Sequence, residues 1–323
     1  MSEAVSKKSG YLSLSTKGEM LASGPVRQIY EAQDSVGESI IWREDDRSLY
    51  WIDIGYKRIH QLELYTGRHR LWDTPDFVTS LGMRLDGGFI VGLSREVCLW
   101  SPGGRFESFA CPEPDILDNR LNEGRVSPDG SFWVGTMQNN LHPDGSPKAT
   151  DRSSGAIYRI SPSGDVKRLT ENNIGLSNTM AWTTDNRFLF ADTSVNEIYA
   201  FDYDPEALEL RNRRAIVSGF ERGLPDGSCI DADNNLWNCR VVGGSCLANF
   251  TTDGELIRVI ELPISWPTSC TFGGDDLSTL FVTSARWSMS DDHLAKNPLE
   301  GNLFAVKADV QGVPEPRFGA KPA

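Results

Sequence analysis

Four oxygen-bearing side chains stand in similar local settings along the chain. They are Glu38 in "DSVGESIIW", Asn122 in "NRLNEGRV", Asn178 in "GLSNTMAW" and Asp226 in "GLPDGSCID". Two carboxylates and two amides make an all-oxygen donor set, which suits a hard divalent cation such as Ca²⁺, Mg²⁺ or Mn²⁺. Asn and Asp beside glycine are otherwise turn formers. The residue types therefore indicate a metal site only if the fold brings the four together.

A polar run at residues 119–123 carries the same signal. "NRLNE" places Asn119, Arg120, Asn122 and Glu123 directly before "GRVSPDGSFWVGTM", which has the pattern of a strand, a tight turn and a second strand. Strongly polar side chains are rarely buried unless they have partners. The residues alone leave open what this run contacts in the folded protein.

The elements that must position these residues repeat along the chain. Aromatic-rich strand patterns begin at Ser48, Gly88, Ser131, Arg187, Asn235 and Thr279, at intervals of 40, 43, 56, 48 and 44 residues. Turn-forming stretches precede them at 43–48, 84–88, 127–131, 183–187, 231–235 and 273–278. Repeats of this length with several strands each are typical of β-propellers. The sequence predicts an all-β fold, a six-bladed β-propeller.

Each candidate residue lies a few positions before a turn-forming stretch, in the segment entering the innermost strand of a blade. Loops from every blade meet at one mouth on the propeller axis, so residues distant in sequence can converge there. We expect a single propeller domain over residues 26–323 and a flexible extension over residues 1–25. A helical turn or two is expected within residues 290–300.

Composition excludes several classes of function. The 323 residues carry 32 Lys and Arg against 45 Asp and Glu, a formal charge of −13, whereas nucleic-acid binding needs clustered basic residues. The first 24 residues lack the apolar region of a secretory signal, and no apolar stretch is long enough to span a membrane. Six cysteines without a C-x-x-C pair favour reduced thiols in a cytoplasmic protein. The oligomeric state is left open.

Four motifs together resemble the gluconolactonase family, also known as the regucalcin or senescence marker protein family. They are "VGESIIW", "NRLNEGRVSPDGSFWVGTM", "GLSNTMAWTTDNRFLFADTSVNEIYAFDYD" and "GLPDGSCIDADNNLW", and the similarity runs from about Ser35 to Val310. The resemblance implies a six-bladed propeller that hydrolyses a sugar lactone with a divalent metal on the axis. Ca²⁺ is the first expectation for the metal, with Zn²⁺, Mn²⁺, Mg²⁺ or Fe²⁺ as alternatives.

The resemblance also assigns roles to residues of this chain. It implies Arg120 as a substrate hydrogen-bond donor and a metal bound by Glu38, Asn178, Asp226 and, directly or through water or substrate, Asn122. Lactone hydrolysis needs a polarised carbonyl and an activated water, and a bound cation can serve both needs. Asp226 is expected to act as both a ligand and the general base, a role worth roughly 10²–10⁴ in rate.

Two departures from the family bear on the substrate. After "GTM" the chain has Gln138, Asn139 and Asn140, where many members carry acidic residues, and after "NLWNC" it has Arg240 and Val241 instead of an aromatic residue. The lost negative charge and the gained cation predict a substrate with an anionic substituent, with Asn140 and Arg240 as substrate-binding residues. The alternative is that Arg240 pairs with a neighbouring carboxylate outside the pocket.

Other readings of the sequence compete with a lactonase. Four histidines without an H-x-x-x-H spacing disfavour a histidine-rich zinc site, and His142 is expected to be a solvated loop residue. The chain lacks the G-x-S-x-G of a serine hydrolase elbow. A non-catalytic propeller binding module and a calcium-binding protein remain alternatives, since the fold alone does not establish an enzyme.

Overall fold

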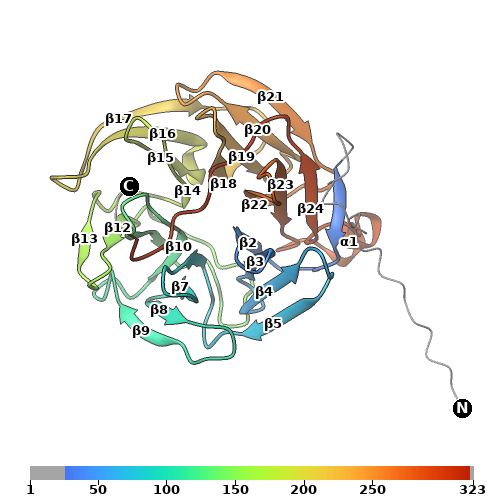
Figure 1. The fold of residues 1–323 in the computed structure, drawn as a ribbon, viewed down its shortest axis with the longest axis horizontal. Coiled ribbons are helices and arrows are strands. Elements are labelled where there is room, and N and C mark those ends of the chain that lie inside the picture. Colours follow the sequence, from blue (N-terminus) through green and yellow to red (C-terminus); the bar gives the residue numbers. More distant parts are fainter. Residues whose placement is uncertain (1–25, 321–323) are drawn as a thin grey trace, which may run out of the picture.

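Six four-stranded antiparallel sheets surround a central axis, as Figure 1 shows. This computed structural model describes residues 26–320, and the extension expected over residues 1–25 lies outside the described residues. The predicted six-bladed β-propeller is confirmed. The strand that follows each turn-forming stretch is the second strand of its blade, so the candidate residues lie on innermost strands, as expected.

The first three blades follow one another in the chain. Blade one contains β2 (Gly37–Arg43), β3 (Ser48–Asp53), β4 (Arg58–Glu63) and β5 (His69–Asp73). Blade two contains β6 (Ser80–Met83), β7 (Phe89–Gly92), β8 (Val97–Trp100) and β9 (Glu107–Ala110). Blade three contains β10 (Asn119–Val126), β11 (Phe132–Gln138), β12 (Ile157–Ile160) and β13 (Val166–Arg168).

The last blade joins the two ends of the propeller. Blade four contains β14 (Ser177–Trp182), β15 (Arg187–Asp192), β16 (Glu197–Asp204) and β17 (Glu209–Ser218), with the short 3-10 helix η1 (Thr193–Val195) between β15 and β16. Blade five contains β18 (Leu224–Ile230), β19 (Leu236–Val241), β20 (Cys246–Phe250) and β21 (Leu256–Glu261). Blade six contains β22 (Pro267–Gly273), β23 (Thr279–Ser284), β24 (Leu303–Lys307) and, as its outer strand, β1 (Arg27–Tyr30). Pairing of β1 with β24 closes the ring.

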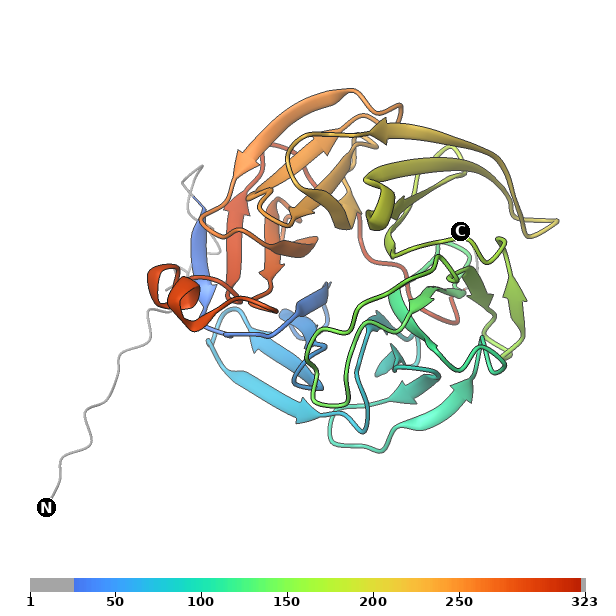
Figure 2. The ribbon, with the colours of Figure 1, turned by 180° about the vertical axis from the view of Figure 1, so that it is seen from behind.

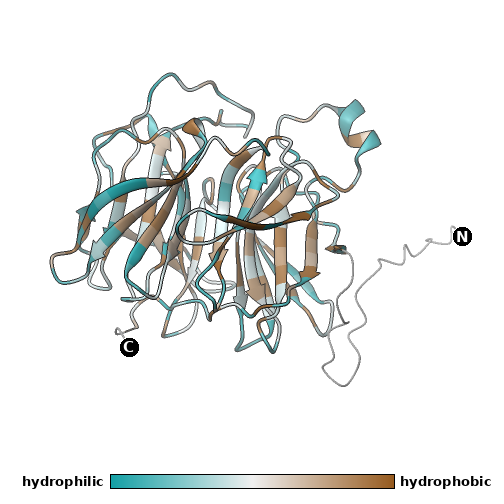
Figure 3. Cartoon of the chain, turned by 90° about the horizontal axis from the view of Figure 1, so that it is seen from above, coloured by the Kyte–Doolittle hydropathy of each residue, from teal (hydrophilic) through white to brown (hydrophobic). Residues whose placement is uncertain are grey.

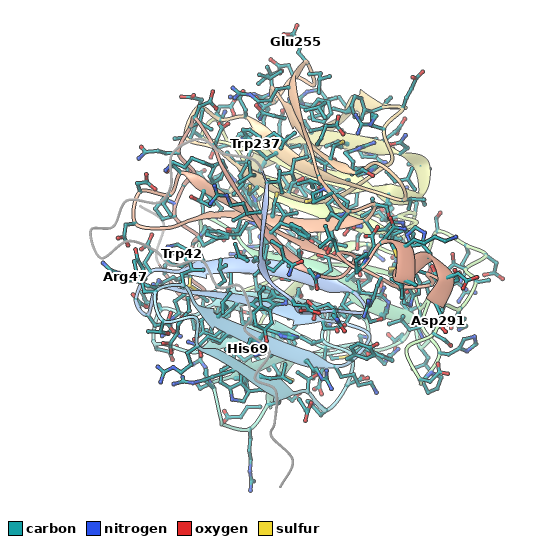
Figure 4. The ribbon with its side chains drawn as sticks, turned by 90° about the vertical axis from the view of Figure 1, so that its right-hand side faces the viewer. Trp42, Arg47, His69, Trp237, Glu255 and Asp291 are labelled. Carbon is teal, nitrogen blue, oxygen red and sulfur yellow. The ribbon has the colours of Figure 1, made fainter. Side chains whose placement is uncertain are left out.

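Aromatic side chains fill the space between the blades. Trp51, Trp133 and Trp237 occupy the second strands of three blades and are completely buried. The indole nitrogen of each of these three tryptophans donates to a nearby side-chain oxygen, so none of the three buried N–H groups is left unpaired. Figure 4 shows Trp42 and Trp237 among the sheets, whereas Glu255 and Asp291 lie at the periphery. Inter-blade packing therefore explains the tryptophans of these strands without a binding role.

The two faces of the propeller carry different coverings. The face in the foreground of Figure 2 bears the one helix of the described residues, α1 (Asp291–Lys296), within the segment expected to be helical. The same face bears the long connection 139–156 between β11 and β12, which crosses blade one. The opposite face is crossed by the C-terminal segment 311–320, in the foreground of Figure 1. The two coverings lie at opposite ends of the axis, as the side view of Figure 3 shows.

Two further properties were predicted from composition. All six cysteines are free thiols, five of them buried and Cys111 exposed. Over residues 26–320, no helix has the length and apolar character needed to cross a bilayer.

Candidate active site

The innermost strands carry irregularities at the positions of the candidate ligands. Among the described sheets, five innermost strands shift register against their neighbours, and the shifts begin at Glu38, Leu121, Asn178, Pro225 and Pro267. A bulge bends its strand and turns a side chain in a new direction. Strand β6 pairs in register throughout and supplies no candidate. The residues that follow two of the candidates, Ser39 and Thr179, have positive φ angles of 49° and 48°.

The bulges bring all four predicted oxygen-bearing residues to one cavity. Glu38, Asn122, Asn178 and Asp226 line a cavity of about 240 Å³, on the face that carries residues 139–156. We call these four residues the oxygen set. Each is at least nine-tenths buried, with exposed fractions of 8%, 9%, 4% and 7% in that order. The convergence expected from the repeat pattern is therefore present.

The two carboxylates of the oxygen set lie close together in a buried place. Burial raises the pKa of Glu38 well above its usual range, and the nearby charges of Asp226 and Glu123 raise it further. Burial and Glu123 likewise raise the pKa of Asp226. Within residues 26–320 neither carboxylate forms an ion pair; each accepts a main-chain N–H, from Ser39 in one case and from Gly227 in the other. Like charges held together without a partner make a site that favours a cation.

The two asparagines of the oxygen set differ in how free their oxygens are. Asn178 donates from Nδ2 to Thr193 at 2.8 Å, and its Oδ1 accepts a long hydrogen bond from Asn122 Nδ2 at 3.4 Å, which leaves one lone pair of this oxygen for the cavity. Asn122 accepts from Arg120 Nη1 at 2.7 Å and donates to the Ser177 carbonyl at 2.8 Å, so both ends of its amide are in use. The set fits a divalent cation held by Glu38, Asn178 and Asp226, with Asn122 acting through its neighbours. The described residues contain no group of three or more His, Cys, Asp or Glu side chains that could hold a metal; the candidate donor set has two carboxylates and an amide oxygen.

Arg120 and Asn140 form a polar wall beside the oxygen set. Arg120 donates to the Asn140 Oδ1 from Nε at 3.0 Å and from Nη2 at 2.8 Å, and to the Leu121 carbonyl at 2.8 Å. Burial lowers the pKa of Arg120 to about 10, so the guanidinium remains protonated at neutral pH. Both residues line the cavity, where the sequence placed them.

Arg240 does not reach the cavity, and the substrate contact expected of it is wrong. It is completely buried, and its guanidinium lies 5.0 Å from the ring centroid of Phe220. Its donors bind protein oxygens: the side chains of Asn238 and Asn196 and the main-chain carbonyls of Arg222, Phe220 and Gly223. These bonds take four of its five N–H groups, and Arg240 is not among the residues that line the cavity. The alternative expectation is correct in placing Arg240 outside the pocket but wrong in its partner, because carbonyls and amides bind the guanidinium instead of a carboxylate.

The remaining polar residues of the 119–123 run support the site from behind. Asn119 donates to Glu113 at 2.8 Å and to the Ser154 carbonyl at 2.9 Å, and so ties β10 to the connection 139–156. Glu123 is buried below the oxygen set, and burial raises its pKa to about 7. His142 is exposed, as expected for a loop residue.

Several cavity residues were missed by the sequence reasoning. Trp266 and Trp287 of blade six and Val242 of blade five line the cavity, as do Thr193 and Ser194 of η1. They lie in connections at the end of the propeller rather than on strands, and connections show no repeat pattern. The one usable signal was the length of the connection between Ser284 at the end of β23 and Leu303 at the start of β24, in which α1 interrupts the strand repeat.

Comparisons with known proteins agree with this geometry. A family described as SMP-30/Gluconolactonase/LRE-like region matches residues 36–286. Regucalcin from Oryctolagus cuniculus is 31% identical over 86% of this chain and 93% of its own length. The 6-deoxy-6-sulfogluconolactonase of Pseudomonas putida is 31% identical over 88% of this chain and 94% of its own length.

A solved structure shows the same fold along nearly the whole chain. The regucalcin of Agrobacterium tumefaciens, described as a calcium-binding protein, superposes with a TM-score of 0.83 at 27% identity, covering 93% of this chain and 100% of that one. Family match, relatives and structure thus extend over the blades that supply the oxygen set. The chain belongs to the SMP-30/gluconolactonase/LRE-like family.

Proposed function

We propose that this protein is a lactonase that depends on a divalent cation and hydrolyses a sugar lactone to the open hydroxy acid. The observation that carries the proposal is the pair of buried carboxylates, Glu38 and Asp226, facing an asparagine oxygen in an axial cavity without any ion-pair partner among the described residues. The relative named 6-deoxy-6-sulfogluconolactonase supports the reaction class. A single domain formed by the propeller suffices to position every proposed group.

The choice of cation follows from the donor atoms. Carboxylate and amide oxygens favour hard cations, so Ca²⁺ is the first candidate, and Mg²⁺, Mn²⁺, Zn²⁺ and Fe²⁺ are alternatives to be tested. The description of the Agrobacterium regucalcin as calcium-binding supports this order. When bound, such a cation supplies Lewis acidity to the lactone carbonyl and lowers the pKa of a nearby water.

The protein's own residues account for the other requirements of hydrolysis. The water oxygen forms a bond to the carbonyl carbon, the ring C–O bond breaks, and the ring oxygen gains a proton. In the proposal Asp226 takes the proton of the attacking water on its carboxylate and later returns it. Glu38 contributes a second negative charge to the site. Arg120 and Asn140 hold hydroxyl groups of the substrate and so fix its orientation at the carboxylates.

The experiment that tests this function is a chelator assay on the full chain. Proton release from D-glucono-1,5-lactone is followed, above the spontaneous rate, after chelation and after return of each cation in turn. We expect activity to disappear with chelator, to return with Ca²⁺ and to be lost in Asp226→Asn. Asp233→Asn is the matched control, since Asp233 is an exposed residue in the turn that follows the same strand.

The alternatives predict different outcomes of the same assay. A non-catalytic calcium-binding protein would bind the cation without turnover, and a binding module would show neither. Full activity in Asp226→Asn, or activity indifferent to chelation, would overturn the proposal. A cytoplasmic location stays a prediction; the six free cysteines favour a reducing compartment.

A further inference from the structure

The cavity that holds the oxygen set has one polar side and one apolar side. The polar side belongs to blades three and four and includes Arg120, Asn140 and Ser194. The other side belongs to blades one, five and six, which also supply Glu38, Asp226 and Thr268, and we call its apolar residues the apolar rim. It consists of Val36, Ile54, Val241, Val242, Trp266 and Trp287.

Few polar groups remain for the hydroxyls of a substrate. The hydroxyls of Thr193, Ser194 and Thr268 already donate to oxygens of the protein. Arg120 uses four of its five N–H groups on Asn140, Asn122 and its neighbour's carbonyl. The Asn140 amide nitrogen has no partner within residues 26–320. Apart from the indole N–H of Trp266, the free donors therefore lie on the side of blade three, and a hydroxyl lying against the aliphatic part of the apolar rim would lose its hydrogen bonds to water without replacement.

Val242 shows that the apolar rim is not a by-product of folding. Its backbone has a positive φ of 56°, a conformation that β-branched residues rarely adopt. Its side chain is 51% exposed, so burial in the core does not account for valine there. Asn would fit this backbone better. An apolar occupant of the cavity gives the side chain a contact that the protein itself does not supply.

The two tryptophans of the rim differ: the indole N–H of Trp287 is bonded to the protein, whereas that of Trp266 has no partner within residues 26–320. Trp287 donates from Nε1 to the Gly145 carbonyl at 3.0 Å, which uses its only polar atom and holds residues 139–156 against blade six. Leu141 of that connection packs with Ile54 and Phe77. The rim is thereby continued by the connection above blade one, and Arg120 is the one cation among the described residues that line the cavity.

We infer that the substrate is a lactone whose hydroxyl groups occupy one edge and whose remote substituent is apolar, such as a methyl, alkyl or aromatic group. This inference rests on the proposed function and specifies its substrate class. The hydroxyl edge lies against Arg120 and Asn140, and the apolar substituent lies against Val242, Trp266 and Trp287. An anionic substituent at the same place would meet a single free donor, the indole N–H of Trp266, and no cation of the rim.

Matched lactones that differ in one hydroxyl test this specificity. The panel pairs hexono-1,5-lactones with their 6-deoxy counterparts in the gluco, galacto and manno series and includes 6-deoxy-6-sulfogluconolactone as the anionic member. One apolar group in a fitting pocket is worth roughly 10- to 200-fold in kcat/KM. We expect kcat/KM at least about tenfold higher for the 6-deoxy member of the best series, with the anionic lactone the poorest substrate.

Val242→Asn connects the preference to the rim. Asn suits the positive φ, so the variant keeps its fold, and we expect the 6-deoxy preference to fall to roughly threefold or less, since one contact carries much of it. Val166→Asn is the matched control, because Val166 lies on β13, is 39% exposed and is remote from the cavity. Dissociation constants of the corresponding lactams, measured by calorimetry, give the same comparison without turnover.

The outcomes separate this inference from the proposed function. Hydrolysis in which the parent lactones or the anionic lactone equal or exceed the 6-deoxy members overturns the apolar specificity and leaves the lactonase standing. A preference that persists unchanged in Val242→Asn also overturns it, since the rim would then not be its source. Absence of hydrolysis and of lactam binding with every cation overturns both.

Discussion

The two ends of the propeller axis treat buried charge in opposite ways. At the end covered by residues 139–156, Glu38 and Asp226 lie together without an ion-pair partner in the described structure. At the end crossed by the C-terminal segment, Arg125 binds Glu315 at 2.9 Å and lies 3.8 Å from Glu123. Burial alone would lower the pKa of Arg125, but these two carboxylates raise it above its usual range.

This difference distinguishes the candidate binding site at one end of the axis from the other end, which the C-terminal segment covers. A buried charge that the fold neutralises itself contributes to architecture, whereas buried carboxylates without a cation either keep a proton or take up a cation. The C-terminal segment brings Glu315 to the axis and is anchored by main-chain hydrogen bonds of Phe318 with blade two and of Gly319 with blade three. Under the proposed function, the first end is completed by a cation and a substrate, whereas at the second end Arg125 already has carboxylate partners within the chain.

The largest expected effect comes from the unneutralised end. Asp226→Asn should reduce kcat by roughly 10²–10⁴, because it removes the proposed base. In chelator the same variant should unfold at an equal or higher temperature than the wild type, because one of two repelling buried carboxylates is gone. Kinetics and thermal unfolding, measured on one preparation, check the expected fall in kcat and the expected equal or higher unfolding temperature. Lower stability in chelator together with full activity would place the residue in the architecture instead.

The neutralised end should respond in the reverse sense. Arg125→Met leaves Glu315 and Glu123 buried without their cation, and removal of one partner of such a pair costs about 3–5 kcal/mol. We expect a large loss of unfolding free energy in denaturant titrations and a kcat within a few-fold of wild type for the molecules that remain folded. Glu315→Gln is the milder companion. A selective loss of kcat in either variant would mean that the two ends are coupled.

Arg240 lies between these cases, near Asp226 but bound by protein oxygens. Arg240→Lys cannot reproduce the guanidinium fork, and bonds to a charged donor contribute about 1.5–3 kcal/mol each, of which a lysine retains some. The expected result is a moderate loss of stability with equal proportional changes in kcat/KM for neutral and anionic lactones. A loss confined to anionic lactones would restore the substrate role that the structure contradicts.

The pH dependence of stability gives the smallest effect. The raised pKa values of Glu38 and Asp226 mean that the folded chain retains protons that the unfolded chain has released. In chelator, unfolding free energy should therefore fall as pH rises from about 4, the unfolded carboxyl pKa, through the raised folded values. Saturating Ca²⁺ should flatten this fall, because it stabilises the deprotonated folded form.

A second group titrates in the same window and must be separated. Glu123 has a pKa raised to about 7, so it also weakens the fold as pH rises. The difference between melting curves of wild type and Asp226→Asn, recorded with and without Ca²⁺, isolates the oxygen set. An equal calcium effect in both proteins would contradict the assignment.

The fold and the convergence of the oxygen set could be predicted from the sequence because both follow from a repeat. Turn chemistry at stretches such as 183–187 and 231–235 marks the hairpins, and strand pairing then forces residues before each turn toward the axis. The register shifts at Glu38 and Asn178, which aim these side chains, occur at short polar motifs that the sequence displays.

The surroundings of Arg240, the pairing of Glu315 and the apolar rim could not be predicted, because they depend on contacts that no local sequence pattern encodes. Arg240 lies next to Val241 in sequence, yet neighbouring residues of a strand point to opposite faces, so one is buried behind the site while the other lines it. Glu315 reaches Arg125 across 190 residues of chain. The apolar rim is assembled from connections of three blades, and its pattern appears only when they meet.

The most direct test of the central claim is calorimetric titration of Ca²⁺ into chelator-stripped protein. It compares wild type with Asp226→Asn at one end of the axis and Glu315→Gln at the other. The account predicts a single bound ion in the wild type, unchanged binding in Glu315→Gln and loss of binding in Asp226→Asn. Absence of binding in the wild type, or binding that survives Asp226→Asn, would contradict it.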